Sequence, residues 1–132
     1  MFKGKNKLSS LEWEIMEIIW REKNPVSVRQ VREIAYPDGE KAYTTVQTVM
    51  NNLANKGFLA KEKIGLVNFY HPLRDHQKSL LKEVKTFAGV TFGGSLPALA
   101  SFLIDSDSLT TAEIEALKQL IEEKTGKGGE NG

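Results

Sequence analysis

Residues 43–57 read YTTVQTVMNNLANKG, and this stretch decides the fold. Four of its apolar residues recur at the spacing i, i+3, i+4 and i+7, which places them on one face of a helix. They are Val46, Val49, Met50 and Leu53. Gly57 then supplies the residue type that most readily adopts the left-handed conformation at a helix end. The stretch therefore predicts a helix from about Thr44 to Lys56 with one face in the core.

The opposite face of this helix carries hydrogen-bonding side chains and no charge. Its members are Thr44, Thr45, Gln47, Thr48, Asn51, Asn52 and Asn55. A face that only meets water more often carries Glu and Lys, which are also better helix formers. Asparagine and glutamine pair with adenine through two hydrogen bonds, and threonine offers a hydroxyl or a methyl group to a base. The pattern favours a face that reads bases over one that is merely solvated.

Two shorter helices are expected before this one, because the same start signal occurs twice. Ser9 with Glu12, and Ser27 with Gln30, have the spacing of a capping box, in which each side chain bonds the other residue's backbone N–H. The first helix should end near Glu22, because the Asn-Pro pair that follows cannot continue it. The second is short and ends near residue 35.

The residues after the decisive helix change to an extended pattern. Residues 58–63 and 67–72 are short, partly alternating runs separated by a turn at residues 64–66, which predicts a β-hairpin. Three helices followed by a hairpin is the order of a winged helix-turn-helix. We therefore expect a mainly α fold with one small hairpin, and a winged helix-turn-helix DNA-binding domain over residues 1–72.

The charge distribution agrees with this interpretation. Residues 1–72 carry 11 Lys and Arg against 8 Asp and Glu, whereas residues 73–132 carry 7 against 9. Lysines near the polar helix face could hold phosphates, although a lysine on an exposed strand also discourages edge pairing. These lysines are Lys41, Lys56, Lys61 and Lys63. A basic half joined to a mildly acidic half is typical of a DNA reader with a separate association module.

Residues 73–124 predict three amphipathic helices, about 74–88, 95–104 and from residue 110 onward, with glycines at 89, 93 and 94 interrupting the first. Together they are too small to bury much apolar surface alone, so a partner chain is the expected cover. We interpret this region as a helical dimerisation domain, and the glycine-rich residues 125–132 as a disordered tail. The expected contact residues are Leu80, Leu81, Val84, Phe87, Leu96, Leu99, Phe102, Leu103, Ile114, Leu117 and Ile121.

Several functional classes find no support in the sequence. The chain has no cysteine, which excludes disulfides and thiolate metal sites and is compatible with a reducing cytoplasm. No apolar run approaches the roughly 20 residues of a membrane-spanning helix. His71 and His76 lie on either side of Pro72, so they do not share a helix face as metal ligands would. No nucleophile–base pair or phosphate-binding loop is present, and we expect no enzyme, metal or cofactor.

Several segments resemble the penicillinase repressor family, the bacterial winged-helix repressors that control β-lactamase, methicillin-resistance and copper-transport genes. The resemblance covers about residues 8–123, nearly the whole chain. The residues that carry it are Leu11–Met16 with Trp20, Ala42–Thr48, Leu53, Lys56-Gly57 and Tyr70–Leu73.

The resemblance implies a homodimer on a palindromic operator, with the C-terminal helices interlocked. In the β-lactam branch it also implies derepression through a membrane sensor metalloprotease and cleavage of the repressor, here between Ser101 and Phe102. Phe102 is equally consistent with a side chain of the dimer core. The better-known members have Asn at Ser101, and the β-lactam repressors have Arg at Gln47 and Asn52, so their operator sequence does not transfer. The missing cysteines exclude copper sensing through paired Cys-x-Cys motifs.

We therefore predict a cytoplasmic repressor that acts on double-stranded DNA and does not insert into the membrane. The alternative is a winged-helix protein-interaction module that does not bind DNA, and an enzyme with a site assembled only in the dimer is a third possibility. Base and nearby backbone contacts are expected from Thr44, Thr45, Gln47, Thr48, Asn51 and Asn52, and sequence-independent contacts from Lys56, Lys61 and Lys63.

Overall fold

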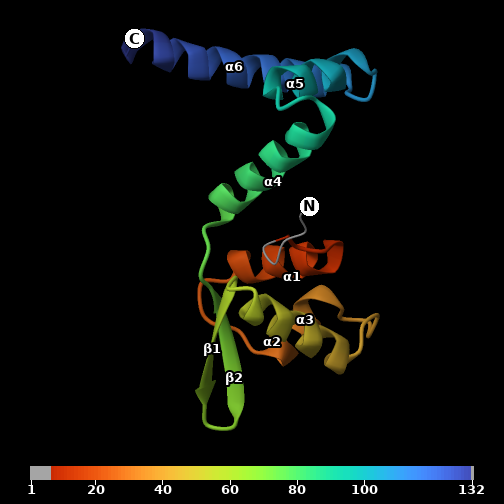
Figure 1. Cartoon of the computed structure of the whole chain (residues 1–132), viewed down its shortest axis with the longest axis vertical. Coiled ribbons are helices and arrows are strands. Elements are labelled where there is room, and N and C mark those ends of the chain that lie inside the picture. Colours follow the sequence, from red (N-terminus) through yellow and green to blue (C-terminus); the bar gives the residue numbers. More distant parts are fainter. Residues whose placement is uncertain (1–6, 132) are drawn as a thin grey trace. The chain divides into compact units, whose positions relative to one another are not determined.

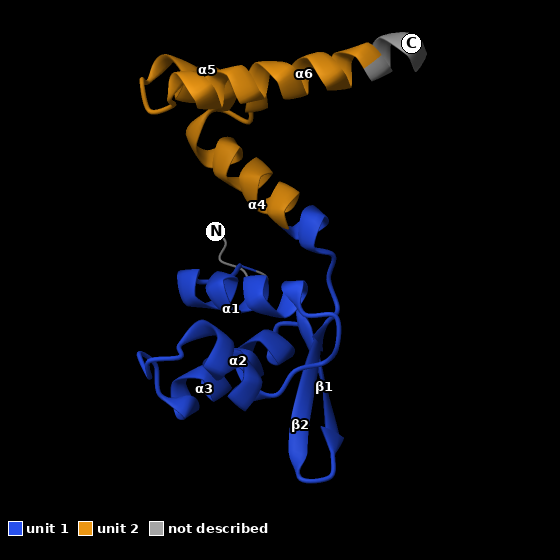
Figure 2. Cartoon of the chain, turned by 180° about the vertical axis from the view of Figure 1, so that it is seen from behind, with its two compact units in different colours: residues 1–79 blue, residues 80–132 orange. Residues whose placement is uncertain are grey.

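The computed structural model describes residues 7–131, and the side chains of residues 7–126. The chain forms two compact units that divide after Ser79 (Figure 2). This division lies later than the expected domain boundary at residue 72. The reason is that the following residues still pack on the first unit: the Trp20 Nε1–H donates to the Arg74 carbonyl at 2.9 Å, and the His76 ring stacks on Trp20 with centroids 4.4 Å apart.

The first unit contains three helices followed by an antiparallel hairpin (Figure 1). The elements are α1 (Ser10–Arg21), α2 (Val28–Ala35), α3 (Tyr43–Asn55), β1 (Leu59–Ile64) and β2 (Val67–Pro72). The hairpin register pairs Leu59 with Pro72 and Ile64 with Val67. The unit is a winged helix-turn-helix, as the sequence predicted.

Both predicted capping boxes are present, and they fix where the first two helices begin. The Glu12 N–H donates to Ser9 Oγ at 3.1 Å, and the Ser9 N–H donates to Glu12 Oε1 at 2.8 Å. Ser27 and Gln30 repeat this exchange at the start of α2, at 3.2 and 2.8 Å. Each box satisfies backbone donors that a helix start otherwise leaves unpaired.

The core of the first unit lies between the three helices and the base of the hairpin. The four apolar residues of α3 are all buried, and Met50 and Leu53 have no exposed surface. Ile15 and Met16 of α1 and Val31 of α2 are equally inaccessible. Removing a large apolar side chain from such a site costs roughly 2–5 kcal/mol, because the lost burial is joined by a cavity. This core positions the opposite face of α3 at the surface.

The hairpin is fixed to the helices through the backbone of Tyr70. Its N–H donates to the Val26 carbonyl at 2.7 Å, and the Val26 N–H donates to the Tyr70 carbonyl at 2.9 Å. Through these bonds Val26, which lies just before α2, pairs with the edge of β2 as an isolated antiparallel bridge. The hairpin base is therefore held beside the helices, and its distal turn extends beyond them (Figure 1).

The second unit consists of helices. They are α4 (His76–Thr91), whose first residues belong to the first unit, α5 (Leu96–Asp105) and α6 (Thr111–Asn131). The expected interruption at Gly89 is wrong, because α4 continues through it to Thr91. Glycine accepts the helical conformation at a cost of about 1 kcal/mol. The chain turns only at Gly93 and Gly94, whose φ angles are +60° and +84°.

The last helix also differs from expectation. α6 extends to Asn131, so residues 125–131 are helical where a disordered tail was expected. No proline interrupts this stretch, and Gly126 has no positive φ.

No single helix among residues 7–131 is long and apolar enough to cross a membrane. The pair α4 and α5 reaches the required length and composition only when both are taken together across an 81° bend.

Candidate nucleic-acid interface

The uncharged face of α3 is open to solvent in the structure. Its exposed members are Thr44, Thr45, Gln47, Thr48, Asn52 and Asn55, while Asn51 is half-buried. The buried apolar residues of the same helix hold this face outward. A rigid row of hydrogen-bonding groups on one helix is suited to the edges of base pairs in a major groove, which admits an α-helix. The structure thus brings the six predicted base-reading residues together on one helix.

Asn51 differs from its neighbours because its amide is engaged within the protein. Its Oδ1 accepts a hydrogen bond from the Tyr70 hydroxyl at 2.9 Å and another from Lys61 Nζ at 3.2 Å. Tyr70 and Lys61 belong to the hairpin, so Asn51 joins α3 to β1 and β2. This contact was not anticipated from the sequence.

Lys56 does not lie with the other expected phosphate ligands. Its Nζ donates to Glu12 Oε1 at 2.7 Å and to the Lys7 carbonyl at 3.0 Å. Glu12 is only 5% exposed and also takes part in the capping box of α1. A buried carboxylate needs such a partner, because an unpaired buried charge is costly. The structure thus engages Lys56 in an ion pair within the protein, at a residue for which the sequence predicted a phosphate contact.

Lys61 and Lys63 lie on β1 and are exposed. Because alternate residues of a strand share a face, both project to the same side of the hairpin. They pair in the register with Tyr70 and Asn68 of β2. Both lysines are thus exposed on the hairpin, and Lys61 contacts α3 through Asn51.

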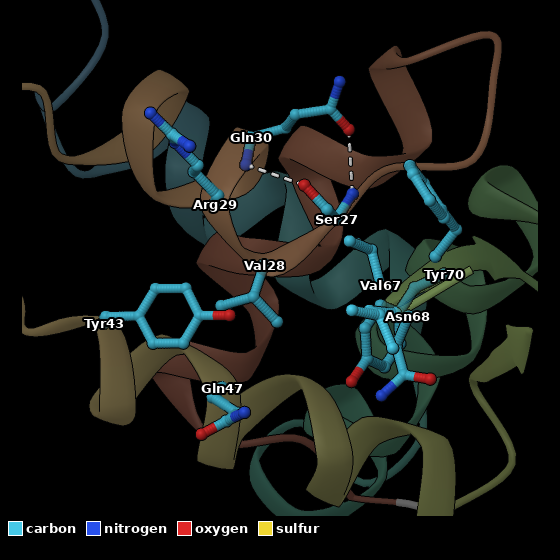
Figure 3. Close-up of a pocket in the computed structure, with 11 residues that line it drawn as sticks. Ser27, Val28, Arg29, Gln30, Tyr43, Gln47, Val67, Asn68 and Tyr70 are labelled. Atoms are coloured by element: carbon cyan, nitrogen blue, oxygen red, sulfur yellow. Dashed lines mark hydrogen bonds between the residues drawn. The ribbon is translucent and has the colours of Figure 1, made fainter. Parts of the chain in front are cut away.

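A groove of about 450 Å³ lies between the start of α2, the start of α3 and strand β2 (Figure 3). Tyr43 and Gln47 line one side of it, and Val67 and Asn68 line the other. Arg29 also lines the groove, and its ion pair with Glu33 at 3.2 Å is highly exposed and therefore weak. Of these polar residues, the sequence had indicated only Gln47. No local sequence signal marks the other polar residues, because they come together only where three elements surround the groove.

The hairpin turn exposes apolar side chains. Leu66 is 94% exposed, and Ile64 and Val67 are exposed beside it. Lysines flank these residues on β1, so the turn combines apolar and cationic character. The sequence had located the turn but gave no reason to expect a surface of this kind.

The histidines do not form a metal site. Among the described residues there is no group of three or more His, Cys, Asp or Glu side chains that could hold a metal ion. His76 Nε2 lies 2.9 Å from Glu17 Oε2, and its ring is stacked on Trp20. His76 therefore attaches the start of α4 to α1.

The sequence matches the profile of the family described as penicillinase repressor over residues 8–123. It is 27% identical to the methicillin resistance regulatory protein MecI of Mammaliicoccus sciuri over 118 residues, which cover 89% of this chain and 95% of the relative. It is 26% identical to the penicillinase repressor of Staphylococcus aureus over 121 residues, 92% of this chain and 95% of the relative. The solved DNA-binding domain of the repressor BlaI is 28% identical, with a TM-score of 0.49, and covers 57% of this chain and 90% of that domain.

Proposed function

The chain belongs to the penicillinase repressor family, and from this premise we propose that it represses transcription as a homodimer bound to a palindromic operator. Its relatives are regulators rather than enzymes, and the chain is accordingly a DNA-binding repressor and not an enzyme. The observation that carries the proposal is the uncharged, hydrogen-bonding face of α3, held outward by a closed core and placed beside a hairpin with two exposed lysines.

In the proposed complex, α3 enters the major groove of each half-site. The side-chain amides of Gln47 and Asn52 have no hydrogen-bond partner within the described residues, and each can pair with adenine through two hydrogen bonds. Thr44, Thr45 and Thr48 would contact base edges or the nearby backbone. The operator differs from those of relatives with arginine at the Gln47 and Asn52 positions, because arginine pairs preferentially with guanine.

Sequence-independent affinity would come from cations around this face. Lys61 and Lys63 are exposed on the hairpin, and Arg29 lies at the groove edge with only a weak ion pair. Each cation that neutralises a phosphate releases a counterion and contributes to the salt dependence of binding. We assign no phosphate to Lys56, because its ammonium already pairs with Glu12.

The dimer would form through the second unit. Nine of the eleven apolar side chains expected to form its contacts are exposed in the single chain, and Leu80 and Leu99 are partly buried. A second copy of the chain is the occupant we propose, because two readers related by a twofold axis match a palindrome. The half-sites would then lie about one helical turn, or a related spacing, apart.

Release of the operator would follow cleavage in α5. Ser101 and Phe102 are exposed on this helix in the single chain. Cutting between them would divide the helix that carries Leu99 and Leu103, and with it the dimer contact. The proposed antirepressor is a membrane sensor metalloprotease, with the repressor itself in the cytoplasm. Exposure of the purified repressor to that protease domain, followed by mass spectrometry of the fragments, tests the position of the cut.

Selection of bound sites from random double-stranded DNA tests the proposal as a whole. The wild-type chain should recover palindromic sites, and binding to them should weaken steeply with salt. Gln47→Ala should lose discrimination at one position of each half-site by roughly 1–3 kcal/mol. Binding that is neither sequence-selective nor salt-sensitive would point instead to a winged helix that contacts another protein.

A further inference from the structure

The hydrogen bonds of Asn51 determine what this residue can offer to DNA. Its Oδ1 accepts from the Tyr70 hydroxyl at 2.9 Å and from Lys61 Nζ at 3.2 Å. An amide oxygen has two lone pairs, and these two donors occupy both. The acceptor half of the side chain is therefore used inside the protein.

The orientation of the amide follows from the chemistry of its partners. A lysine ammonium only donates, so the amide atom that faces Lys61 must be the oxygen. Burial, and to a lesser degree the charge of Tyr43, raises the pKa of Tyr70 above its usual value of 10.0, so its hydroxyl keeps its proton at neutral pH and can donate. The backbone of Tyr70 is fixed by its two hydrogen bonds to Val26.

The nitrogen of the same amide remains available to a ligand. Nδ2 of Asn51 donates to no other group within the described part of the chain. No side-chain nitrogen or oxygen there is both fully buried and without a hydrogen bond, so Nδ2 keeps some solvent-accessible surface. The half of Asn51 that DNA can reach consequently offers donors alone. These fit purine N7, guanine O6, thymine O4 or a phosphate oxygen, whereas the bidentate pair with adenine also needs the amide oxygen.

We propose that Tyr70 is a positioning residue for DNA reading, which turns the Asn51 amide so that only its donors face the bases and excludes the bidentate adenine pair at one position of each half-site. The inference rests on the proposed function. Lys61 cannot impose this orientation in the complex, because it is exposed and phosphates compete for its ammonium. Tyr70 is 1% exposed and has no such competitor. A side chain that cannot touch DNA thereby sets a base preference.

Site selection with full-length variants tests this inference. Tyr70→Phe removes the hydroxyl and leaves the ring, so the amide can rotate and present its oxygen. We expect this variant to gain preference for adenine at one position per half-site by roughly 5–150-fold, the range that a good bidentate contact supplies. Asn51→Ala should lose base preference at that same position, and Asn51→Ala combined with Tyr70→Phe should behave there as Asn51→Ala alone.

Tyr36→Phe is the matched control. Tyr36 is 6% exposed, and its hydroxyl donates to Glu14 Oε2 at 3.0 Å, so the substitution also removes one hydrogen bond of a buried tyrosine. Its partner lies on α1 and not on α3. We expect this variant to melt at a lower temperature and to select the same sites as the wild type.

The outcomes separate this inference from the function on which it rests. If Tyr70→Phe weakens every site by the same factor, or alters a position that Asn51→Ala leaves unchanged, Tyr70 is a structural residue only and the inference fails alone. If the wild-type chain selects no sequence at all, the proposed function fails, and the inference with it. A circular dichroism melt of each variant identifies any that do not fold.

Discussion

The two units of the chain differ in how much of their apolar surface they bury. In the first unit, sixteen apolar residues from Leu8 to Tyr70 are buried, among them Ile15, Met50 and Leu53 without exposed surface. In the described part of the second unit, Ala88 is the only buried residue. Phe102 and Leu120, by contrast, are 59% and 61% exposed. The first unit closes its own core, whereas the second has amphipathic helices whose apolar side chains are largely exposed in the single chain.

The difference indicates how the two parts depend on protein concentration. A closed core is stabilised by contacts within one chain, so its free energy of unfolding does not depend on how much protein is present. An interface between two copies is stabilised by mass action. Under the proposed function, DNA reading belongs to a unit that closes its own core, and pairing belongs to a unit whose apolar side chains are exposed in the single chain.

The largest expected effect comes from a matched pair of leucine substitutions. Leu53→Ala in the first unit should lower the free energy of unfolding by roughly 2–5 kcal/mol, because it leaves a cavity in a fully buried core. Leu117→Ala in the second unit should instead weaken association, with an effect that grows as the protein is diluted. Urea titrations at several protein concentrations measure both. If both variants lost the same free energy of unfolding at every protein concentration, the distinction between the two units would be wrong.

Lys56→Met should destabilise the first unit by roughly 1–3 kcal/mol. The substitution leaves the carboxylate of Glu12 buried without its ionic partner, although Ser9 still donates to it. The salt dependence of operator binding should stay at its wild-type slope, because this ammonium is not available to a phosphate. A shallower salt dependence would show that Lys56 contacts a phosphate.

Lys63→Ala should weaken DNA binding and leave stability nearly unchanged, the reverse of what is expected for Lys56→Met. Lys63 is exposed on β1, so the melting temperature should change little. Loss of one phosphate contact should lower the slope of log affinity against log salt by about 0.9 and weaken all sequences alike. Affinities measured across a salt series on selected and unrelated duplexes check this. A sequence-dependent loss would show that Lys63 contacts a base.

Gly89→Ala should produce the smallest change, a gain of roughly 0.5–1 kcal/mol in the second unit. Gly89 lies inside α4 without a positive φ, and an added Cβ meets no atom within 4 Å. Thermal melts at fixed protein concentration measure the gain. Gly57→Ala is the contrasting variant, because Gly57 has a φ of +85° and alanine there should destabilise. A loss of stability on Gly89→Ala would indicate that Gly89 lies in a close contact between two chains.

Local signals in the sequence were sufficient for most of the fold. The two capping boxes, the apolar spacing of α3 and the turn at Gly65 each depend on residues within a few positions, and the structure has all of them. The features that were missed depend on partners distant in the chain. Lys56 lies 44 positions from Glu12, and Asn51 lies 19 from Tyr70, so no periodicity reveals either contact.

Glycine was misinterpreted for a related reason. Gly89 and Gly94 are the same residue type, but only Gly94 has a positive φ, and its N–H donates to the Ala88 carbonyl at 2.9 Å. Whether a glycine ends a helix thus depended on the hydrogen bonds of the following turn. In the candidate site, the residues proposed to read bases followed from α3 alone, whereas Arg29, Tyr43 and Asn68 became apparent only when three elements were placed around one groove.

Binding to a whole operator and to a single half-site tests the central claim most directly. The measurement compares the full-length wild type with Leu117→Asp, which places a charge on the exposed apolar face of α6. We predict that the wild type loses most of its affinity when one half-site is removed. Leu117→Asp should bind both duplexes equally weakly while keeping the wild-type base preferences. A wild type that binds the half-site as tightly as the palindrome, or a Leu117→Asp variant that loses its base preferences, would contradict the account.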